Sequence, residues 1–207
     1  MRMGKGKLIV VSGFSGAGKG TLMNALTEQY DNYALSVSAT TRAPRPGEVE
    51  GVSYFYKTDE EFKDMIERDE LIEYAGYVGH YYGTPKAFVE ANLEAGKDVL
   101  LEIEIQGAMK IKSKYPDAIL MFVTPPSAQI LRERLTKRGT EDAGVIEARL
   151  RRATEEAEGV EAYDYIVVND NLRECAETVD RIVKSEHNKA GERISLIKEI
   201  RADLLKR

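Results

Sequence analysis

The sequence predicts an α/β fold with a parallel central sheet that is flanked by helices. Short, continuously apolar runs alternate along the chain with stretches of helical periodicity, which is typical of a parallel sheet covered on both faces. The glycine-rich segment GFSGAGKGT, residues 13–21, directly follows the first of these runs. A glycine-rich turn between a strand and a helix can hold a phosphate group, so the same segment supports the fold class and points to a ligand.

Four apolar runs predict strands of the central sheet. In chain order they are KLIVVSG, the first part of KDVLLEIEIQG, AILMFVTPP and DYIVVND. Runs of this length with β-branched residues are typical of buried strands, and two prolines end the third run. A helix from about Lys19 to Gln29 is expected after the first strand.

Three further helices are indicated by end signals or by periodicity. In TDEEF, Thr58 and Glu61 form a capping-box pattern. In GTPKAFVEANLEAG, we expect Thr84 to cap a helix, Pro85 to take its first position and Gly96 to follow its end. The C-terminal tail has apolar residues at helical spacing and predicts an amphipathic terminal helix.

Two segments interrupt the pattern of the core. Residues 35–84 are rich in Tyr and Gly and alternate apolar with polar residues, which predicts a small mixed or antiparallel insert. Residues 132–158 are dense in charge and predict a loop and a helix that close over a site as a lid. The expected division is core (1–34), insert (35–84), core (85–131), lid (132–158), and core with C-terminal helices (159–207).

Composition and charge exclude several classes of partner. The chain has 207 residues and a net charge of −5, so nothing in its charge predicts a nucleic-acid or membrane partner. Its apolar runs fall short of the roughly 20 residues that span a bilayer. The single cysteine, Cys175, cannot form an internal disulfide, and we expect it to be a packed apolar side chain. We therefore expect a cytoplasmic protein.

The pattern G-x-x-x-x-G-K after a strand and before a helix predicts a nucleoside triphosphate site. Backbone N–H groups converge on the phosphates, the helix N-terminus adds its positive end, and Lys19 reaches the outer phosphates. Gly20 stands where many such loops carry a hydroxyl for magnesium. Because Mg²⁺ keeps several waters, we expect a more hydrated metal site. The residues expected to bind the donor phosphates are Gly13, Phe14, Ser15, Gly16, Ala17, Gly18, Lys19, Gly20 and Thr21.

A second anion site is indicated in the insert. In TTRAPRPGE, Arg42 and Arg45 are three residues apart in a loop stiffened by Pro44 and Pro46. Two guanidinium groups suit a phosphate dianion. The string VVND lacks the lysine of the N-K-x-D motif with which GTPases read guanine. A hydrolase has no need of a second phosphate site, so the two sites favour transfer from one substrate to another.

Five segments together resemble guanylate kinase, an ATP:GMP phosphotransferase. They are SGFSGAGKGT, SVSATTRAPRPGEVEG, LIEYAGYVGHYYGT, LEIEIQGA and RLTKRGT, in this order and spacing, over about residues 7–187. The resemblance implies a P-loop kinase fold with a GMP-binding insert and a helical lid. It implies in-line transfer of the γ-phosphoryl group of ATP to GMP, giving ADP and GDP without a covalent enzyme intermediate, and a need for Mg²⁺.

The resemblance also implies which residues bind GMP. Those matching ligands of the GMP phosphate are Arg42, Arg45, Tyr54 and Tyr82, and those matching readers of guanine are Ser38, Glu73 and Thr84. The chemistry agrees, because an ionised carboxylate can accept both N1–H and N2–H of guanine. Adenine offers an acceptor at N1 and would leave the carboxylate unpaired.

Two glutamates close a predicted strand. In VLLEIE, Glu102 and Glu104 are expected on one face of that strand, because side chains alternate with period two. We expect Glu102 to act on magnesium through the water molecules of the metal shell, and Glu104 to lie nearer GMP.

The resemblance assigns the charged interruption to a lid over ATP. We expect Arg134, Arg138 and Arg149 to close on the ATP phosphates, and Asn169 to lie beside adenine. The catalytic residues implied are Lys19, Arg42, Arg138 and Arg149, which would stabilise the charge of the transferring phosphoryl group. The neighbouring Arg151 and Arg152 are expected on a solvated face of the helix.

Two other interpretations stay open at this point. One is a phosphate-loop kinase for another nucleoside monophosphate, such as AMP. The other is a non-catalytic guanylate kinase-like module that binds phosphorylated peptides, although such modules usually have a degraded phosphate loop and Lys19 is intact here. The sequence also leaves open whether the chain forms a homo-oligomer.

Overall fold

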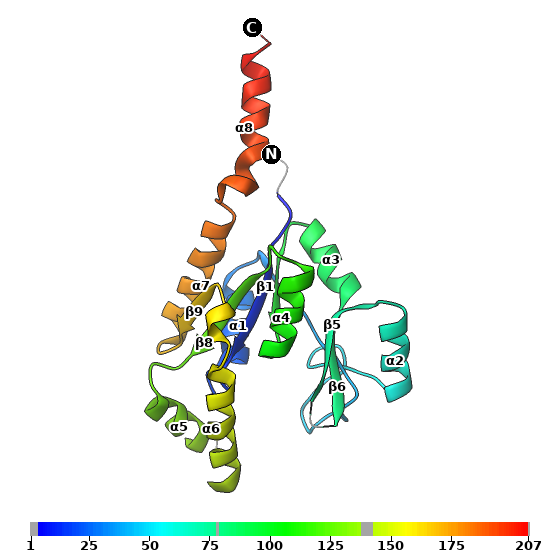
Figure 1. Ribbon diagram of the computed structural model, residues 1–207, viewed down its shortest axis with the longest axis vertical. Coiled ribbons are helices and arrows are strands. Elements are labelled where there is room, and N and C mark those ends of the chain that lie inside the picture. Colours follow the sequence, from blue (N-terminus) through cyan, green and yellow to red (C-terminus); the bar gives the residue numbers. More distant parts are fainter. Residues whose placement is uncertain (1–3, 78, 138–142, 207) are drawn as a thin grey trace.

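A five-stranded parallel sheet forms the centre of the computed structural model, which describes residues 4–77, 79–137 and 143–206 (Figure 1). The strands, in their order across the sheet, are β2 (Tyr33–Leu35), β7 (Asp98–Glu102), β1 (Leu8–Gly13), β8 (Ile119–Thr124) and β9 (Tyr165–Val168). Every neighbouring pair is parallel. The predicted α/β class is confirmed, and the four predicted strands are present. Strand β2 was not predicted, because its three residues are too few to show periodicity.

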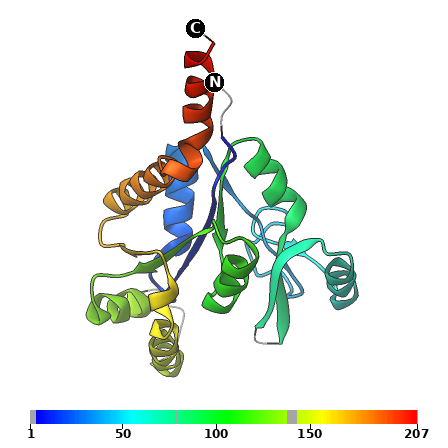
Figure 2. The same cartoon turned by 45° about the horizontal axis from the view of Figure 1, so that its top comes forward.

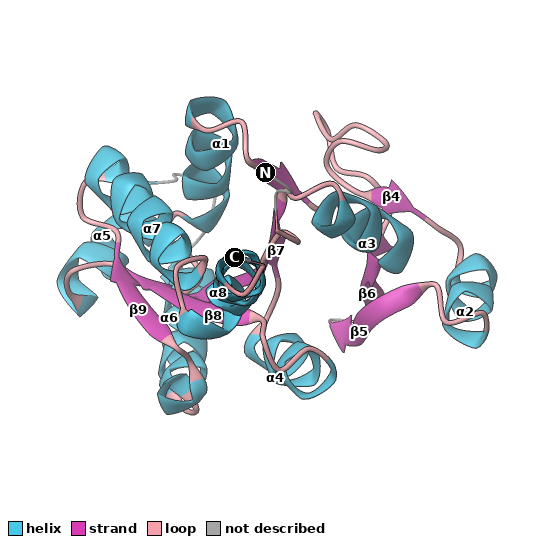
Figure 3. Ribbon diagram, turned by 90° about the horizontal axis from the view of Figure 1, so that it is seen from above, coloured by secondary structure: helices cyan, strands magenta, loops and turns pink. Residues whose placement is uncertain are grey.

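Helices cover both faces of this sheet. The helices of the described residues are α1 (Lys19–Gln29), α2 (Asp59–Glu67), α3 (Lys86–Glu94), α4 (Ile105–Lys114), α5 (Ala128–Lys137), α6 (Ala143–Ala157), α7 (Leu172–Glu186) and α8 (Ala190–Leu204), with a 3₁₀ turn at Val160–Ala162. Figure 3 shows α1 and α7 on one side of the sheet and α4 on the other. Among the described residues, no helix combines the length and apolar character that crossing a membrane requires.

Alternate residues of the apolar strands belong to two separate cores. On β1, Ile9 and Val11 pack with side chains of α1 and α7, whereas Leu8 and Val10 pack with side chains of α3 and α4. Because both faces are covered, these strands are apolar at nearly every position. Cys175 of α7 lies in the first core, where burial raises the pKa of its thiol to about 11. The expectation of a packed thiol is confirmed.

The insert forms a second sheet with the strand order β4-β3-β6-β5. Its strands are β3 (Ala39–Thr40), β4 (Phe55–Tyr56), β5 (Leu71–Tyr77) and β6 (His80–Pro85). The β3–β4 pair is parallel and the other two pairs are antiparallel, so the sheet is mixed, as expected. Helix α2 covers it and begins with the predicted capping box, in which Thr58 and Glu61 bond each other's backbone N–H.

One predicted helix start is wrong. Strand β6 continues through Thr84 to Pro85, and α3 begins only at Lys86 without a side-chain cap. The hydroxyl of Thr84 is instead directed to a cross-strand partner, described below. The other end of α3 agrees with the sequence analysis, because the left-handed Gly96 follows the last helical turn.

The insert and the α5–α6 pair lie on two sides of the carboxyl end of β1 (Figures 1 and 2). Helices α5 and α6 pack on each other through Leu131, Leu135 and Ala153, and Phe14 of the loop after β1 joins this small cluster. In parallel sheets, ligands bind at the carboxyl ends of the strands. This end is therefore where the predicted phosphate loop needs to be, and it is where β1 ends.

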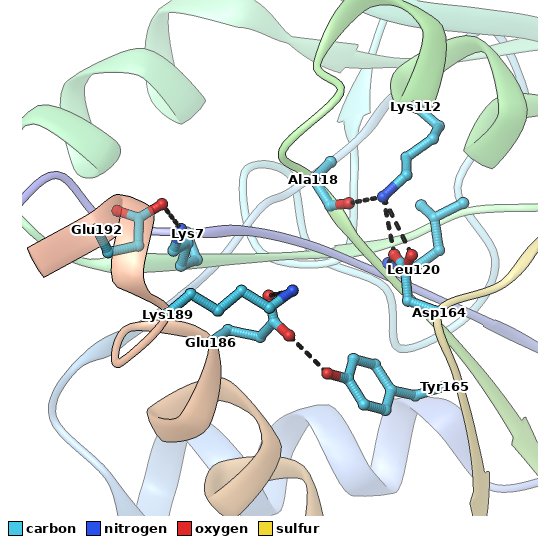
Figure 4. A network of polar contacts seen from close by, with 9 residues as sticks. All are labelled: Lys7, Lys112, Ala118, Leu120, Asp164, Tyr165, Glu186, Lys189 and Glu192. Carbon is cyan, nitrogen blue, oxygen red and sulfur yellow. Dashed lines mark hydrogen bonds and ion pairs between the residues drawn. The ribbon is translucent and has the colours of Figure 1, made fainter. Parts of the chain in front are cut away.

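The opposite end of the sheet carries a polar network that attaches the joint between α7 and α8 (Figure 4). Lys7 forms an ion pair with Glu192, and the hydroxyl of Tyr165 donates to Glu186 at 2.5 Å. Lys189 pairs with the same glutamate at 2.7 Å. Beyond this joint α8 stands away from the body, with no buried residue of its own (Figure 1). The predicted terminal helix is present.

Candidate active site

The phosphate loop has the conformation that its glycines require. It joins the end of β1 to the start of α1. Gly18, the N-cap of α1, has a φ of 89°, in the left-handed region that favours glycine. A Cβ atom on Gly13 would lie 2.1 Å from the carbonyl oxygen of Val123, so no larger residue fits there. Backbone geometry thus explains two of the glycines in the motif.

The loop presents positive groups to one place. Lys19 folds back over it, and its Nζ donates to the carbonyl oxygens of Gly13 at 2.9 Å and Phe14 at 3.3 Å. Within the described part of the chain, α1 begins without a side-chain cap and with no acidic residue in its first turn. The N–H groups at its start are therefore available to an anion, which the helix dipole also favours.

Two residues of the predicted donor site lie against or beside this loop. The Nδ2 atom of Asn169 donates to the carbonyl oxygen of Ala17 at 2.8 Å, and the side chain is buried. Arg134 of α5 reaches toward the carbonyl oxygen of Asp170, with 3.5 Å between the two atoms. Asn169 thus supports the loop itself, whatever base the ATP site receives.

The lid residues are placed in part. Arg149 is half-buried on α6. The predicted catalytic Arg138 lies outside the described residues. Helix α6 is the helix that was expected in this segment, whereas α5 was not predicted.

Glu102 lies beside the phosphate loop. It is the last residue of β7 and is paired in register with Val11 of β1. Its Oε2 atom lies 3.7 Å from where a Cβ atom on Gly20 would be. The residue is exposed at the surface, yet desolvation by the surrounding protein raises the pKa of its carboxyl group. The charge of Lys19 opposes that rise. A hard oxygen donor is therefore next to the loop.

This donor set fits magnesium. Among the described residues, no group of three or more Asp, Glu, His or Cys side chains could hold a metal ion. Mg²⁺ usually binds one or two carboxylates, phosphate oxygens and several waters rather than a full protein cage. One carboxylate at Glu102, together with the phosphates that the loop holds, matches that requirement. Gly20 contributes no hydroxyl, as the sequence analysis noted.

The expected placement of Glu104 on a strand is wrong. Strand β7 ends at Glu102, and Glu104 is the N-cap of α4, so strand periodicity does not relate the two side chains. The carboxylate of Glu104 accepts a hydrogen bond of 2.7 Å from Nη2 of Arg152 on α6. Because of this bond, the expectation that Arg152 only faces solvent is also wrong.

Glu156 is a contact of the loop that the sequence analysis missed. Its Oε2 atom accepts a hydrogen bond of 3.2 Å from the backbone N–H of Ser15 in the phosphate loop. Its Oε1 atom accepts one of 3.3 Å from Nε of Arg152. A glutamate four residues from an arginine on a helix was visible in the sequence, but its contact with the loop was not.

In the insert, Glu73 and Thr84 form a buried pair. The register of β5 and β6 places them directly opposite each other. The hydroxyl of Thr84 donates to Oε1 of Glu73 at 2.7 Å, and the two residues are only 5% and 1% exposed. Burial raises the pKa of Glu73, while the bond from Thr84 and the charges of Lys110 and Lys114 oppose the rise.

Space near Glu73 is kept by a glycine. The Oε2 atom of Glu73 lies 3.1 Å from where a Cβ atom on Gly107 would be, so a side chain at Gly107 would crowd this oxygen. Ser38, the third expected reader of guanine, is half-buried just before β3, and its carbonyl oxygen accepts a bond from Phe55.

Arg42 is held in place by its neighbours. Its Nη2 donates to Oε1 of Glu48 at 2.8 Å, and its guanidinium lies 5.2 Å from the centre of the Tyr54 ring. The rings of Tyr54 and Tyr82 are 6.0 Å apart. The contacts with Glu48 and Tyr82 keep the pKa of Arg42 above its usual range, and Arg42 lowers the pKa of Glu48 to about 2. Three of the four expected phosphate ligands are therefore together.

Arg45, the fourth, has an exposed side chain. Its backbone N–H donates to Oε2 of Glu48 at 2.7 Å, and the hydroxyl of Tyr56 donates to the same oxygen at 2.8 Å. Glu48 thus organises the whole turn. The sequence analysis missed this role, although the acid three residues after Arg45 was the available signal.

The chain is similar to known proteins over most of its length. A family model described as guanylate kinase matches residues 5–186. A guanylate kinase of Halalkalibacterium halodurans is 49% identical over 189 residues, covering 91% of this chain and 93% of that protein. One of Caldanaerobacter subterraneus subsp. tengcongensis is 49% identical over 199 residues, covering 96% and 97%.

A solved structure is also similar. The crystal structure of guanylate kinase from Anaplasma phagocytophilum matches with a TM-score of 0.74 at 35% identity, over 90% of this chain and 88% of that one. The family model, the sequence relatives and this structure all carry the same family name, and each matches most of the chain. The chain therefore belongs to the guanylate kinase family.

Proposed function

We propose that this chain transfers the γ-phosphoryl group of ATP to GMP, giving ADP and GDP, as a transferase of purine nucleotide metabolism. Membership of the guanylate kinase family supports the reaction. The observation that carries the choice of acceptor is the buried pair of Glu73 and Thr84 in the same chain as an intact phosphate loop.

Glu73 selects guanine. Its ionised carboxylate accepts the N1–H and N2–H groups on one edge of the base, while Thr84 and Ser38 orient it. Adenine lacks these donors and would leave a buried carboxylate unpaired, which disfavours its binding strongly. The phosphate of GMP is bound by a set of cationic and hydroxyl groups at Arg42, Arg45, Tyr54 and Tyr82.

Residues 13–21 hold the phosphates of ATP, and Lys19 neutralises charge that moves to the leaving oxygen. Arg134 and Arg149, with Arg138, close over the transferring group. A phosphate oxygen of GMP is already a competent nucleophile, so the in-line step requires no general base and no covalent enzyme intermediate. Glu102 would hold magnesium through its water shell, and the ion would supply charge neutralisation at the phosphate oxygens. The rate comes from positioning and charge neutralisation.

The expected division of the chain is part of the proposal. The insert (35–84) and the lid (132–158) move toward the core when both nucleotides bind, and their closure excludes water, the competing acceptor. The location of these two segments on two sides of the carboxyl end of β1 supports this motion (Figure 1). We also propose a cytoplasmic location, where both nucleotides are found, and cell fractionation with an antibody to the chain would test it.

The deciding experiment measures ADP release with ATP, Mg²⁺ and each of several nucleoside monophosphates. We expect kcat/KM for GMP to exceed that for AMP by on the order of 10⁴. Higher efficiency with AMP would contradict the role of Glu73. Absence of ADP release with every acceptor, together with tight binding of phosphorylated peptides, would instead support the non-catalytic module.

A further inference from the structure

Three charged side chains connect the phosphate loop, through α6, to the start of α4. The N–H of Ser15 donates to Glu156 at 3.2 Å, and the other oxygen of Glu156 accepts from Nε of Arg152 at 3.3 Å. A different nitrogen of the same guanidinium, Nη2, donates to Glu104 at 2.7 Å. A single arginine on α6 therefore joins two carboxylates that belong to separate parts of the fold.

One end of this connection lies in the phosphate loop, and the other lies at the start of α4, a helix that contacts the insert. Ser15 belongs to the phosphate loop. Glu104 is the N-cap of α4, and three residues later Gly107 borders the Oε2 atom of Glu73. The same helix contacts β5, where Lys110 donates to the carbonyl oxygen of Tyr74 at 2.9 Å. A displacement of α4 is therefore transmitted to the strand that carries Glu73.

Stability alone gives little reason for these contacts. The side chains of Arg152 and Glu104 are 33% and 58% exposed, and ion pairs at that exposure contribute little to folding. Geometry is their distinctive property. A planar guanidinium binds two carboxylates in fixed directions, which a lysine cannot do with one flexible ammonium group.

Electrostatics make the connection sensitive to ATP. Glu156 brings a negative charge to the loop, beside the place where phosphates bind. Arriving phosphates repel that charge, and Arg152 is the cation that neutralises it. The position of α6 is therefore biased by the donor site, and Arg152 passes that bias to Glu104.

We propose that Arg152 is a positioning residue that couples the two sites, so that ATP at the loop strengthens the binding of GMP in the insert. The proposal rests on the proposed function, since it names how the two substrates of that reaction affect each other. Coupling is reciprocal, so GMP strengthens the binding of ATP by the same factor.

The experiment is calorimetry on the full chain. The Kd of GMP is measured with Mg²⁺ alone and with saturating adenosine 5′-(β,γ-imido)triphosphate, and the reverse titration is run with GMP saturating. In the wild type we expect the analogue to tighten GMP by about fivefold or more, a typical size for such coupling. In Arg152→Ala this factor falls toward one, while each nucleotide alone binds as in the wild type.

Two further variants complete the design. Arg151→Ala removes the adjacent exposed arginine and keeps the full coupling factor. Arg152→Lys keeps the charge but cannot bridge both carboxylates, so its factor lies near that of Arg152→Ala. If Arg152→Ala does not fold by circular dichroism, Arg152→Lys decides alone. A wild-type factor in Arg152→Lys, or equal losses in both arginine positions, overturns the proposal.

The outcomes also separate the inference from the reaction. If the wild type releases ADP with GMP but shows no coupling, or Arg152→Ala retains it, the inference is wrong and the proposed function stands. If the wild type neither binds GMP nor releases ADP with it, the proposed function is wrong, and the inference falls with it.

Discussion

In the proposed reaction the donor loop and the acceptor insert each bind a nucleotide, but with different kinds of groups. The loop uses backbone N–H groups and one lysine from nine consecutive residues. The insert uses side chains from separate strands and a turn, such as Glu73 on β5, Thr84 on β6 and Arg42 after β3. The comparison teaches that a phosphate site made of backbone is local in sequence, whereas a site that selects a base is assembled in three dimensions.

The largest effect is expected at the donor loop. Lys19→Ala removes the side-chain cation that contacts the loop carbonyls of Gly13 and Phe14, and we expect kcat to fall about 10³-fold, as when a single group that stabilises transition-state charge is lost. Steady-state ADP release at saturating GMP measures it. The exposed Lys63 on α2 supplies the control, Lys63→Ala, with unchanged kcat. A fall in kcat of less than tenfold in Lys19→Ala would mean that the loop does not contribute to the chemical step.

A smaller, selective effect is expected in the insert. Glu73→Gln replaces one acceptor by an amide N–H that faces the donors of guanine, so kcat/KM for GMP should fall roughly 10²-fold. Binding of the ATP analogue, measured by calorimetry, should not change. Glu70→Gln, at an exposed position just before β5, is the matched control. Equal losses for both nucleotides would mean that the two regions are not separate sites.

The third prediction uses pH. Burial raises the pKa of Glu73 above the ordinary 4.5, so the proton is taken up at a higher pH than by an exposed glutamate. The protonated acid has lost an acceptor for guanine, so KM for GMP should increase as pH falls toward and through this raised pKa. The KM of Glu73→Gln should lack this component, while titration of the GMP phosphate affects both proteins alike. Parallel KM profiles of the two proteins would contradict the assignment.

The smallest effect concerns the turn that holds Arg42. Glu48→Gln removes the charge that pairs with this arginine, and partly exposed ion pairs are weak. We expect KM for GMP to rise by about two- to fivefold, with KM for ATP unchanged. Glu60→Gln at the exposed start of α2 serves as control. If Glu48→Gln increased KM for ATP by a larger factor than KM for GMP, Glu48 would lie outside the acceptor site.

Much of the fold was predictable because its signals are local. The helix expected from Lys19 to Gln29 has those bounds, and the capping box at Thr58 is present. Apolar runs identified four strands, since buried parallel strands are apolar throughout. The three-residue β2 was not predicted, because it is formed by pairing with β7 and has no sequence pattern of its own.

The candidate site was predictable only where its determinants are consecutive. Thr84 preceded a proline and resembled a helix cap, but the β5–β6 register makes it the partner of Glu73. Glu104 followed an apolar run and resembled a strand residue, but it occupies the N-cap position of α4 and its carboxylate binds Arg152. In both cases the neighbouring residues matched a local pattern, a helix cap or a strand. The folded chain gave the residue a different position, where it contacts residues distant in the sequence.

The sequence by itself determined the phosphate loop, the alternation of strands and helices, and the family to which the chain belongs. These follow from backbone conformation and periodicity, which depend on neighbouring residues. Only the tertiary structure decided three contacts. They are the pairing of Glu73 with Thr84, the ion pair of Glu48 with Arg42, and the bond from Arg152 of α6 to Glu104. These depend on strand register and helix packing, because a side chain far away in sequence becomes a partner only when the folded chain places it there.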